Sequence, residues 1–139
     1  MSVRIGINPI TWSNDDMPAL GGDTPLETCL AETRQAGYAG IEMGGKFPKT
    51  AEALRPVLAR HGLAFISGWY SAKLLERDAD AEIAAMRPHL DLMAGMGCGV
   101  MVFAEVSSGT HGDRTKPAGT RRAIVEQEWP EYARRIGKV

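Results

Sequence analysis

The sequence predicts an α/β fold with parallel strands, made of about four strand–helix units, which is the first half of a (β/α)8 barrel. A recurring phrase carries this prediction: three times a helix-like run ends in a glycine, at Gly37, Gly62 and Gly97, and aliphatic residues follow at once. Strands that alternate with helices favour a parallel sheet with right-handed crossovers. A complete barrel needs eight such units and about 250 residues, whereas this chain has 139. We therefore expect half a barrel, as a single domain over residues 1–139.

The expected strands lie near residues 3–8, 39–44, 63–69 and 99–106, and the expected helices near residues 25–36, 51–61 and 79–96. A glycine just past a helix supplies the left-handed conformation that ends it. The aliphatic run that follows suits a strand covered by helices. Residues 127–139 predict a fourth helix. A dinucleotide-binding fold is disfavoured, because no GxGxxG motif follows the first strand.

The start of the first helix and two internal prolines give more local expectations. Thr24-Pro25-Leu26-Glu27 has the form of a capping box with proline at the first helical position. Pro56 and Pro88 lie inside the second and third helical patterns, where each removes a hydrogen bond. We expect these two helices to kink or to restart at the proline.

The composition is that of an ordinary globular protein, with 44% hydrophobic and 24% charged residues. A formal net charge of −1 gives no footprint for nucleic acid or an anionic membrane. No apolar stretch approaches the length of a membrane span. The start of the chain does not resemble a signal peptide, because Arg4 and Asn8 interrupt its apolar run. Cys29 and Cys98 form no CxxC pair, which disfavours a zinc ribbon or a disulfide scaffold. We expect a cytoplasmic protein with no nucleic-acid or membrane partner.

Alternate residues of a barrel strand face the interior or the helices. The aliphatic faces that we expect against the helices are Val3, Ile5 and Ile7; Ile41 and Met43; Ala64 and Ile66; and Val100, Val102 and Ala104. Asn8, Glu42, Trp69 and Glu105 then point inward near the carboxyl ends of the four strands, where barrel enzymes place their active sites. The alternative is that two of these residues only cap strand ends or pair with loop amides. A buried acid is costly without a purpose, which favours a role for the carboxylates.

The loops after the four strands hold further candidates: Trp12, Asn14, Asp15 and Asp16; Lys46; Tyr70, Ser71 and Lys73; and His111 and Asp113. Trp12 and Trp69 suit the wall of a polyol site, since sugar C–H faces pack on indole while its N–H donates a hydrogen bond. The alternative is that both tryptophans pack the top of the barrel. Among the histidines only His111 has a position suited to chemistry. Glu42, Glu105 and His111 could in principle supply three metal ligands.

Three segments resemble the inosose dehydratase family and the closely related rhizopine catabolism proteins. They are Ile5-Gly-Ile-Asn-Pro-Ile-Thr-Trp-Ser-Asn-Asp-Asp16, Gly37-Tyr-Ala-Gly-Ile-Glu-Met-Gly-Gly-Lys-Phe-Pro48 and Ser67-Gly-Trp-Tyr-Ser71. The resemblance runs from about Val3 to about Asp113 and is specific, because it lies in loop residues as well as in the fold. It implies a xylose-isomerase-like (β/α)8 barrel of roughly twice this length.

The resemblance also implies an activity: a lyase that dehydrates 2-keto-myo-inositol with a divalent metal, manganese or cobalt. Such a metal polarises the ketone, a base takes the neighbouring proton and an acid helps the β-hydroxyl leave as water. In that superfamily the metal ligands come from the last four strands, so we expect none in this chain and no tight metal binding by it. The expected site residues are Glu42, Lys46 and Glu105 as catalytic residues, and Asn8, Trp12, Trp69 and His111 as substrate-binding residues.

Two alternatives stay open beside a dehydratase of inositol or rhizopine catabolism. One is a sugar isomerase or epimerase of the same superfamily, and the other is a non-catalytic module that dimerises. An open half-barrel exposes its edge strands and the inward Phe65, Trp69, Met101 and Phe103. We therefore expect a homo-oligomer, and no dehydratase activity from 139 residues alone.

Overall fold

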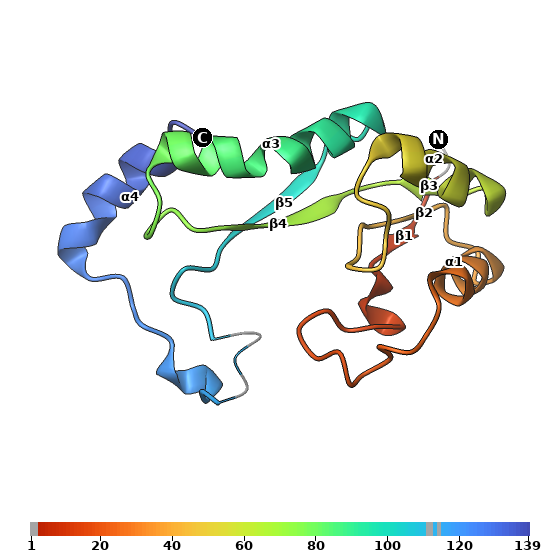
Figure 1. Cartoon of the computed structure of the whole chain (residues 1–139), viewed down its shortest axis with the longest axis horizontal. Helices are drawn as coiled ribbons and strands as arrows, with labels where there is room; N and C mark the ends of the chain where they lie inside the picture. The colour runs from red at the N-terminus through yellow and green to blue at the C-terminus, as the bar shows by residue number, and fades with distance from the viewer. Residues whose placement is uncertain (1–2, 111–112, 114) are drawn as a thin grey trace. The chain divides into compact units, whose positions relative to one another are not determined.

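The computed structural model (Figure 1) describes residues 3–110, 113 and 115–139. The chain divides into two compact units. The first holds the residues up to Trp69 together with His89–Val102, and the second holds Tyr70–Pro88 together with the residues from Phe103 onward. Each unit is described by itself. The single domain expected from the sequence stays a prediction.

The first unit alternates strands and helices as the sequence predicts. Its elements are β1 (Gly6–Ile7), the 3-10 helix η1 (Pro9–Thr11), α1 (Leu26–Gln35), β2 (Gly40–Ile41), α2 (Ala51–Arg60) and β3 (Ala64–Phe65). The strands form one parallel sheet in the order β1-β2-β3, in which Ile7 is opposite Ile41 and Ile41 is opposite Phe65. The parallel α/β arrangement is therefore confirmed.

The chain continues through β4 (Gly68–Ala72), α3 (Ala79–Gly95) and β5 (Met101–Glu105), followed by the 3-10 helices η2 (Ala118–Thr120) and η3 (Glu126–Glu128) and by α4 (Trp129–Ile136). β4 and β5 form a separate two-stranded sheet. The single strand expected near residues 63–69 is therefore wrong, since the chain forms β3 and β4 there, in different sheets. The count of four strand–helix units stays a prediction.

The glycines of the recurring phrase end their helices as expected. Gly37, Gly62 and Gly97 have φ angles of 89°, 61° and 70°, and they follow α1, α2 and α3 by two residues each. Side chains are disfavoured in this left-handed region, whereas glycine enters it freely. The sequence phrase thus marks real helix ends.

The expected capping box is wrong, and neither helix restarts at its proline; the expected kinks stay predictions. Pro25 is the N-cap of α1 and no side chain bonds there; Glu27 Oε1 lies instead 2.8 Å from Nε2 of His61, at the end of α2. Glu27 still places an acidic group in the first turn, where the helix dipole favours it. α2 and α3 each continue through their prolines, Pro56 and Pro88, as single helices.

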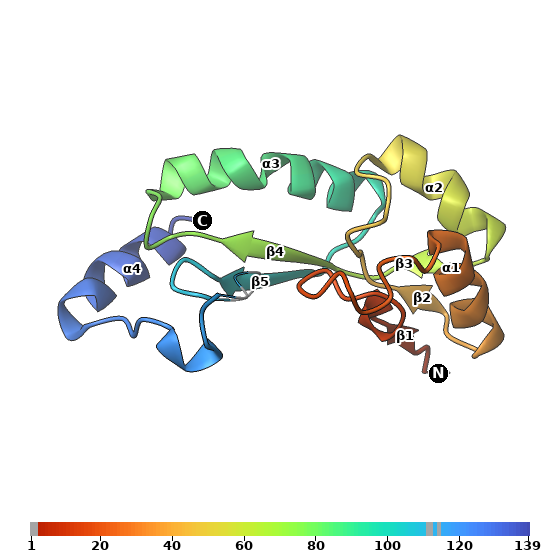
Figure 2. The same ribbon diagram turned by 60° about the horizontal axis from the view of Figure 1, so that its bottom comes forward.

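The helices α1 and α2 lie beside the β1–β2–β3 sheet (Figure 2), and a hydrophobic core joins them to it. Ile41 and Phe65 face this core from the sheet, and α1, α2, the last turns of α3 and two connecting segments supply the rest. The buried members are Leu30, Ile41, Phe47, Leu54, Leu58, Leu63, Phe65, Leu92 and Met93. Burial of each such side chain stabilises the fold by about 1.5–3 kcal/mol.

The inward orientation expected for Phe65 is wrong, because Phe65 is opposite Ile41 in the ladder and faces the same core. The hydrogen-bond register then changes after β3. The amide of Ile66 donates to the carbonyl of Ile41 at 3.3 Å, and the amide of Met43 donates to the carbonyl of Ser67 at 2.9 Å. A regular parallel ladder would join Met43 to Ile66. One extra residue therefore separates the two bonds, as in a β-bulge, and reverses the facing of the side chains.

Two other expectations about facing fail at the sheet margins. Val3, Ile5 and Val100, expected against helices, are 88%, 64% and 59% exposed. Met101, expected to point inward, packs against the core cluster instead. Val3, Ile5 and Val100 lie outside the strands, and Met101 is the first residue of β5.

Candidate functional site

Three polar side chains meet at the carboxyl ends of β1, β2 and β3, and we call them the carboxylate cluster: Asn8, Glu42 and Ser67. Nδ2 of Asn8 donates to Oε1 of Glu42 at 2.5 Å, and Oγ of Ser67 donates to Oε2 of Glu42 at 2.5 Å. Asn8 directly follows β1, Glu42 directly follows β2, and Ser67 lies two residues after β3, so the parallel sheet brings the three side chains together. The inward placement of Asn8 and Glu42 follows the sequence prediction.

The backbone holds the cluster in place. The amide of Glu42 donates to the carbonyl of Ile7 at 2.9 Å, and Oδ1 of Asn8 accepts from the amide of Ile10 at 2.8 Å, which caps η1. Glu42 is half-buried and Asn8 is exposed. Since a carboxylate offers about four acceptor positions, Glu42 keeps acceptor capacity for a ligand hydroxyl beyond its bonds to Asn8 and Ser67.

Lys46 ties the loop after β1 to the loop after β2. Its Nζ donates to the carbonyl of Gly21 at 3.0 Å and to the carbonyl of Thr24. Oδ2 of Asp15 accepts from the amide of Gly45 at 2.7 Å and joins the same two loops. The structure thus gives Lys46 a loop-binding position beside the carboxylate cluster's strands, while its predicted catalytic role stays a prediction.

Replacing Lys46 by methionine should loosen residues 13–25. The change keeps the apolar stem but removes two hydrogen bonds from a charged donor, each worth about 1.5–3 kcal/mol. Amide hydrogen exchange in this loop should accelerate at least about tenfold. Lys49→Met is the matched control, since exposed Lys49 makes a single 3.3 Å bond to the carbonyl of Gly44. Equal exchange in both variants would contradict the loop-binding position.

The two tryptophans differ in their surroundings. Nε1 of Trp12 donates to Oε2 of Glu32 on α1 at 2.5 Å, and the ring is half-buried. Trp69, the last residue of the first unit, is 52% exposed. The indole N–H of Trp12 is therefore already engaged, which leaves its ring face for a ligand. The substrate-binding roles of both residues stay predictions.

Glu105 lies in the second unit and bonds there to loop amides. Its Oε2 accepts from the amide of Leu74 at 2.6 Å, and its Oε1 accepts from the amide of Ser107 at 2.6 Å. These bonds match the alternative stated for the inward residues, in which a carboxylate only pairs with loop amides. The catalytic role predicted for Glu105 stays a prediction, and His111 lies outside the described residues.

Nothing in the sequence marks Glu82 of α3, an acid that is fully buried in the second unit. Its carboxylate accepts from the hydroxyl of Tyr70 at 2.6 Å and from the amide of Lys73 at 3.1 Å, and Nη1 of Arg77 lies 3.5 Å away. Arg135 of α4 holds the same loop, since its Nη1 donates to the carbonyls of Leu74 and Arg77 at 2.7 and 2.9 Å. These contacts fix the loop between β4 and α3.

Burial, followed by the hydrogen bond to Glu82, raises the pKa of Tyr70 from 10.0 to about 12. The folded state therefore favours the protonated phenol, and this contribution to stability is complete below pH 10 and lost as the pH rises from 10 to about 12. In an absorbance titration of the folded protein, Tyr70→Phe should remove the tyrosinate step near pH 12. Glu82→Gln should move that step to lower pH, and an unchanged high-pH step in both variants would contradict the pairing.

The described residues do not fit the divalent metal that the resemblance implies. No group of three His, Cys, Asp or Glu side chains within residues 3–110, 113 and 115–139 is placed to hold an ion. Both oxygens of Glu42 accept from side chains, and both oxygens of Glu105 accept from backbone amides. A metal therefore stays an expectation from the resemblance, and no chemical step is assigned to it.

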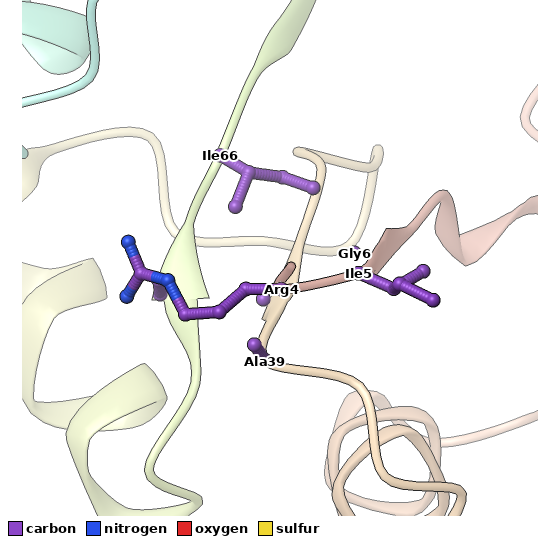
Figure 3. A pocket seen from close by; sticks show the side chains of 7 residues that line it. Arg4, Ile5, Gly6, Ala39 and Ile66 are labelled. Atoms are coloured by element: carbon purple, nitrogen blue, oxygen red, sulfur yellow. The ribbon is translucent and has the colours of Figure 1, made fainter. Parts of the chain in front are cut away.

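A pocket of about 260 Å³ lies at the amino ends of β1, β2 and β3, away from the carboxylate cluster. The side chains of Arg4 and Ile5 extend in opposite directions there, and the side chain of Ile66, which follows β3, also lines the pocket (Figure 3). A Cβ atom at Gly6 would lie 2.1 Å from Cδ1 of Ile66, so a larger residue at position 6 would displace the end of the Ile66 side chain. The lining is apolar apart from Arg4, and such a lining suits neither a polyol nor acid–base chemistry.

No helix of the described residues is long and apolar enough to cross a membrane.

The fold and the cluster define a class: α/β proteins with parallel strands that carry polar ligand-binding residues at their carboxyl ends. Within that class, the chain is 51% identical over 136 residues to the rhizopine catabolism protein MocC of Rhizobium meliloti. It is 36% identical over 128 residues to the inosose dehydratase of Geobacillus thermodenitrificans, and 33% identical over 139 residues to that of Clostridium perfringens strain 13.

These matches confirm the resemblance found in the motifs. They cover 98%, 91% and 99% of the chain, but 42%, 43% and 47% of the relatives. The chain thus spans a little under half the length of the curated relatives it matches. No family model matches the chain.

Proposed function

We propose that the chain forms the substrate-binding wall of a dehydratase that removes water from a keto-inositol, with 2-keto-myo-inositol as the substrate. The carboxylate cluster is the observation that carries this proposal. Its three residues come from the segments in which the motif resemblance lies, and they converge at the strand ends where such sites form. The names of the relatives, inosose dehydratase and rhizopine catabolism protein, support an inositol-like substrate.

The cluster suits a ring that carries many hydroxyl groups. A carboxylate accepts hydrogen bonds from hydroxyls, and such charge-assisted bonds are roughly twice as strong as neutral ones. The exposed amide of Asn8 adds a donor beside the Glu42 acceptor. The ring faces of Trp12 and Trp69 suit the C–H faces of the substrate.

Dehydration next to a ketone needs a base and an acid. The C–H bond beside the ketone breaks and its proton goes to the base, while the C–O bond to the β-hydroxyl breaks and that oxygen leaves as water after taking a proton from the acid. We assign the base to the Glu42 carboxylate, the one acidic group of the cluster. Lys46 ties the loop after β1 to the loop after β2, next to the strand end that carries this carboxylate. The catalytic role expected for Glu105, which lies in the second unit, stays a prediction, and no step is assigned to it.

The proposal is tested by adding 2-keto-myo-inositol to the purified protein and measuring both binding, by calorimetry, and product mass. Saturable binding is expected. A product lighter by one water supports dehydration by this chain, whereas binding without product locates the chemistry in residues beyond those of this sequence. A product of unchanged mass would show an isomerase or epimerase instead, and the absence of binding would overturn the proposal.

A further inference from the structure

We propose that Ser67 is a positioning residue that fixes the Glu42 carboxylate for the ligand. The inference rests on the proposed function, in which Glu42 contacts the keto-inositol. Ser67 is no part of the predicted site, although it shares the expected inward face of its strand with Trp69. A regular continuation of the β2–β3 ladder would place Ser67 opposite Met43, and the extra residue in the ladder at Ile66 and Ser67 brings it to Glu42 instead.

The hydroxyl of Ser67 is placed to hold one oxygen of the carboxylate. Oγ lies 2.5 Å from Oε2 of Glu42, within the range of short bonds between a hydroxyl and a carboxylate. Ser67 is only 8% exposed, so its hydroxyl exchanges little with water. Loss of this donor would leave a carboxylate oxygen without its protein partner.

The backbone at Ser67 is held on both sides. Its carbonyl accepts from the amide of Met43 at 2.9 Å. The next residue, Gly68, packs so closely that a Cβ atom there would lie 2.9 Å from Cε1 of His89 and 3.1 Å from the sulfur of Met93. The backbone bond to Met43 and the close packing of Gly68 thus restrain the backbone that carries the Ser67 hydroxyl.

Ser67 and Asn8 hold the carboxylate in different ways. Asn8 is exposed and binds Oε1 through its side-chain amide, which a ligand can displace or reorient. Buried Ser67 binds Oε2 from a restrained backbone. With both donors in place, rotation of the carboxylate about its last bond is restricted. Without the Ser67 hydroxyl, only the hydrogen bond to Asn8 holds the Glu42 carboxylate, which can then rotate. The acceptor positions that the carboxylate offers to a ligand are no longer fixed.

The test compares wild type, Ser67→Ala and Ser67→Thr. The first readout is the carbon resonance of the Glu42 carboxylate in protein labelled at glutamate Cδ, assigned with Glu42→Gln. The second readout is the dissociation constant for 2-keto-myo-inositol, and denaturant midpoints report folding. Ser67→Ala should move the resonance and raise Kd about three- to tenfold, the equivalent of one ordinary hydrogen bond. Ser67→Thr, which keeps the hydroxyl, should restore both.

An unmoved resonance in Ser67→Ala would overturn the inference, and so would a moved resonance with an unchanged Kd. Equal behaviour of Ser67→Thr and Ser67→Ala, with wild-type midpoints, would also overturn it, because the hydroxyl would then have no role. If the wild type does not bind 2-keto-myo-inositol, the proposed function fails. The resonance then still decides whether Ser67 holds Glu42.

Discussion

Glu42→Gln is expected to weaken the binding of 2-keto-myo-inositol about ten- to a hundredfold, the equivalent of one or two hydrogen bonds to a charged group. The change preserves the size of the side chain but removes the charge and converts one acceptor oxygen into a donor. Nδ2 of Asn8 and Oγ of Ser67 both donate to Glu42 at 2.5 Å, so an amide cannot accept from both in the same way. Calorimetry at fixed ionic strength measures the effect.

Glu52→Gln is the matched control for this variant. Glu52 lies exposed in the first turn of α2, and its replacement changes the net charge by the same amount. Its Kd should equal that of the wild type. Equal affinity of Glu42→Gln and Glu52→Gln for the ligand would mean that the carboxylate cluster does not bind the substrate.

Glu82→Ala is expected to lower the free energy of unfolding by about 3–5 kcal/mol, the cost of removing one partner from a buried ionic cluster. The side chain is fully buried. Loss of the carboxylate leaves the hydroxyl of Tyr70 and the amide of Lys73 without this acceptor. The removed side chain also leaves a cavity beside α3. Denaturant unfolding followed by circular dichroism measures the change, and amide exchange at Lys73 locates it.

Glu76→Ala provides the comparison from the same loop. Glu76 is exposed and lies 3.4 Å from Nζ of Lys73, in a surface ion pair worth at most about 1 kcal/mol. A loss below 1 kcal/mol is therefore expected. Similar small losses in Glu82→Ala and Glu76→Ala would show that the Glu82 contacts do not stabilise the fold.

The sequence predicted the fold best where local signals are strong. Gly37, Gly62 and Gly97 end helices because their φ angles are positive, a requirement visible in the sequence as a repeated phrase. Strand facing was predicted correctly at Ile41, which has paired neighbours on both sides. It failed at Phe65, because this residue faces the core through its pairing with Ile41, and a pairing with a distant strand leaves no local pattern.

The candidate site was predictable to the same extent. Parity and the motif resemblance together brought Asn8 and Glu42 to one place, and the structure joins them. The hydrogen bond between Ser67 and Glu42 depends on the register change after β3, which no local pattern in the sequence shows. Glu82 and Arg135 gave no signal, because an acid in a helix's first turn and an arginine in its last turn are equally typical of exposed surfaces. Their roles come from long-range contacts that only the fold creates.

The most direct test of keto-inositol binding at the carboxylate cluster is a titration of ¹⁵N-labelled protein with 2-keto-myo-inositol, followed by the side-chain amide of Asn8. That amide donates to Glu42, so a ligand that binds the carboxylate must change its environment. We expect saturable shifts of the Asn8 side chain and of the Glu42 and Ser67 amides. Shifts confined to Gly6 and Gly40 at the opposite strand ends, or no saturable shift at all, would contradict binding at the cluster.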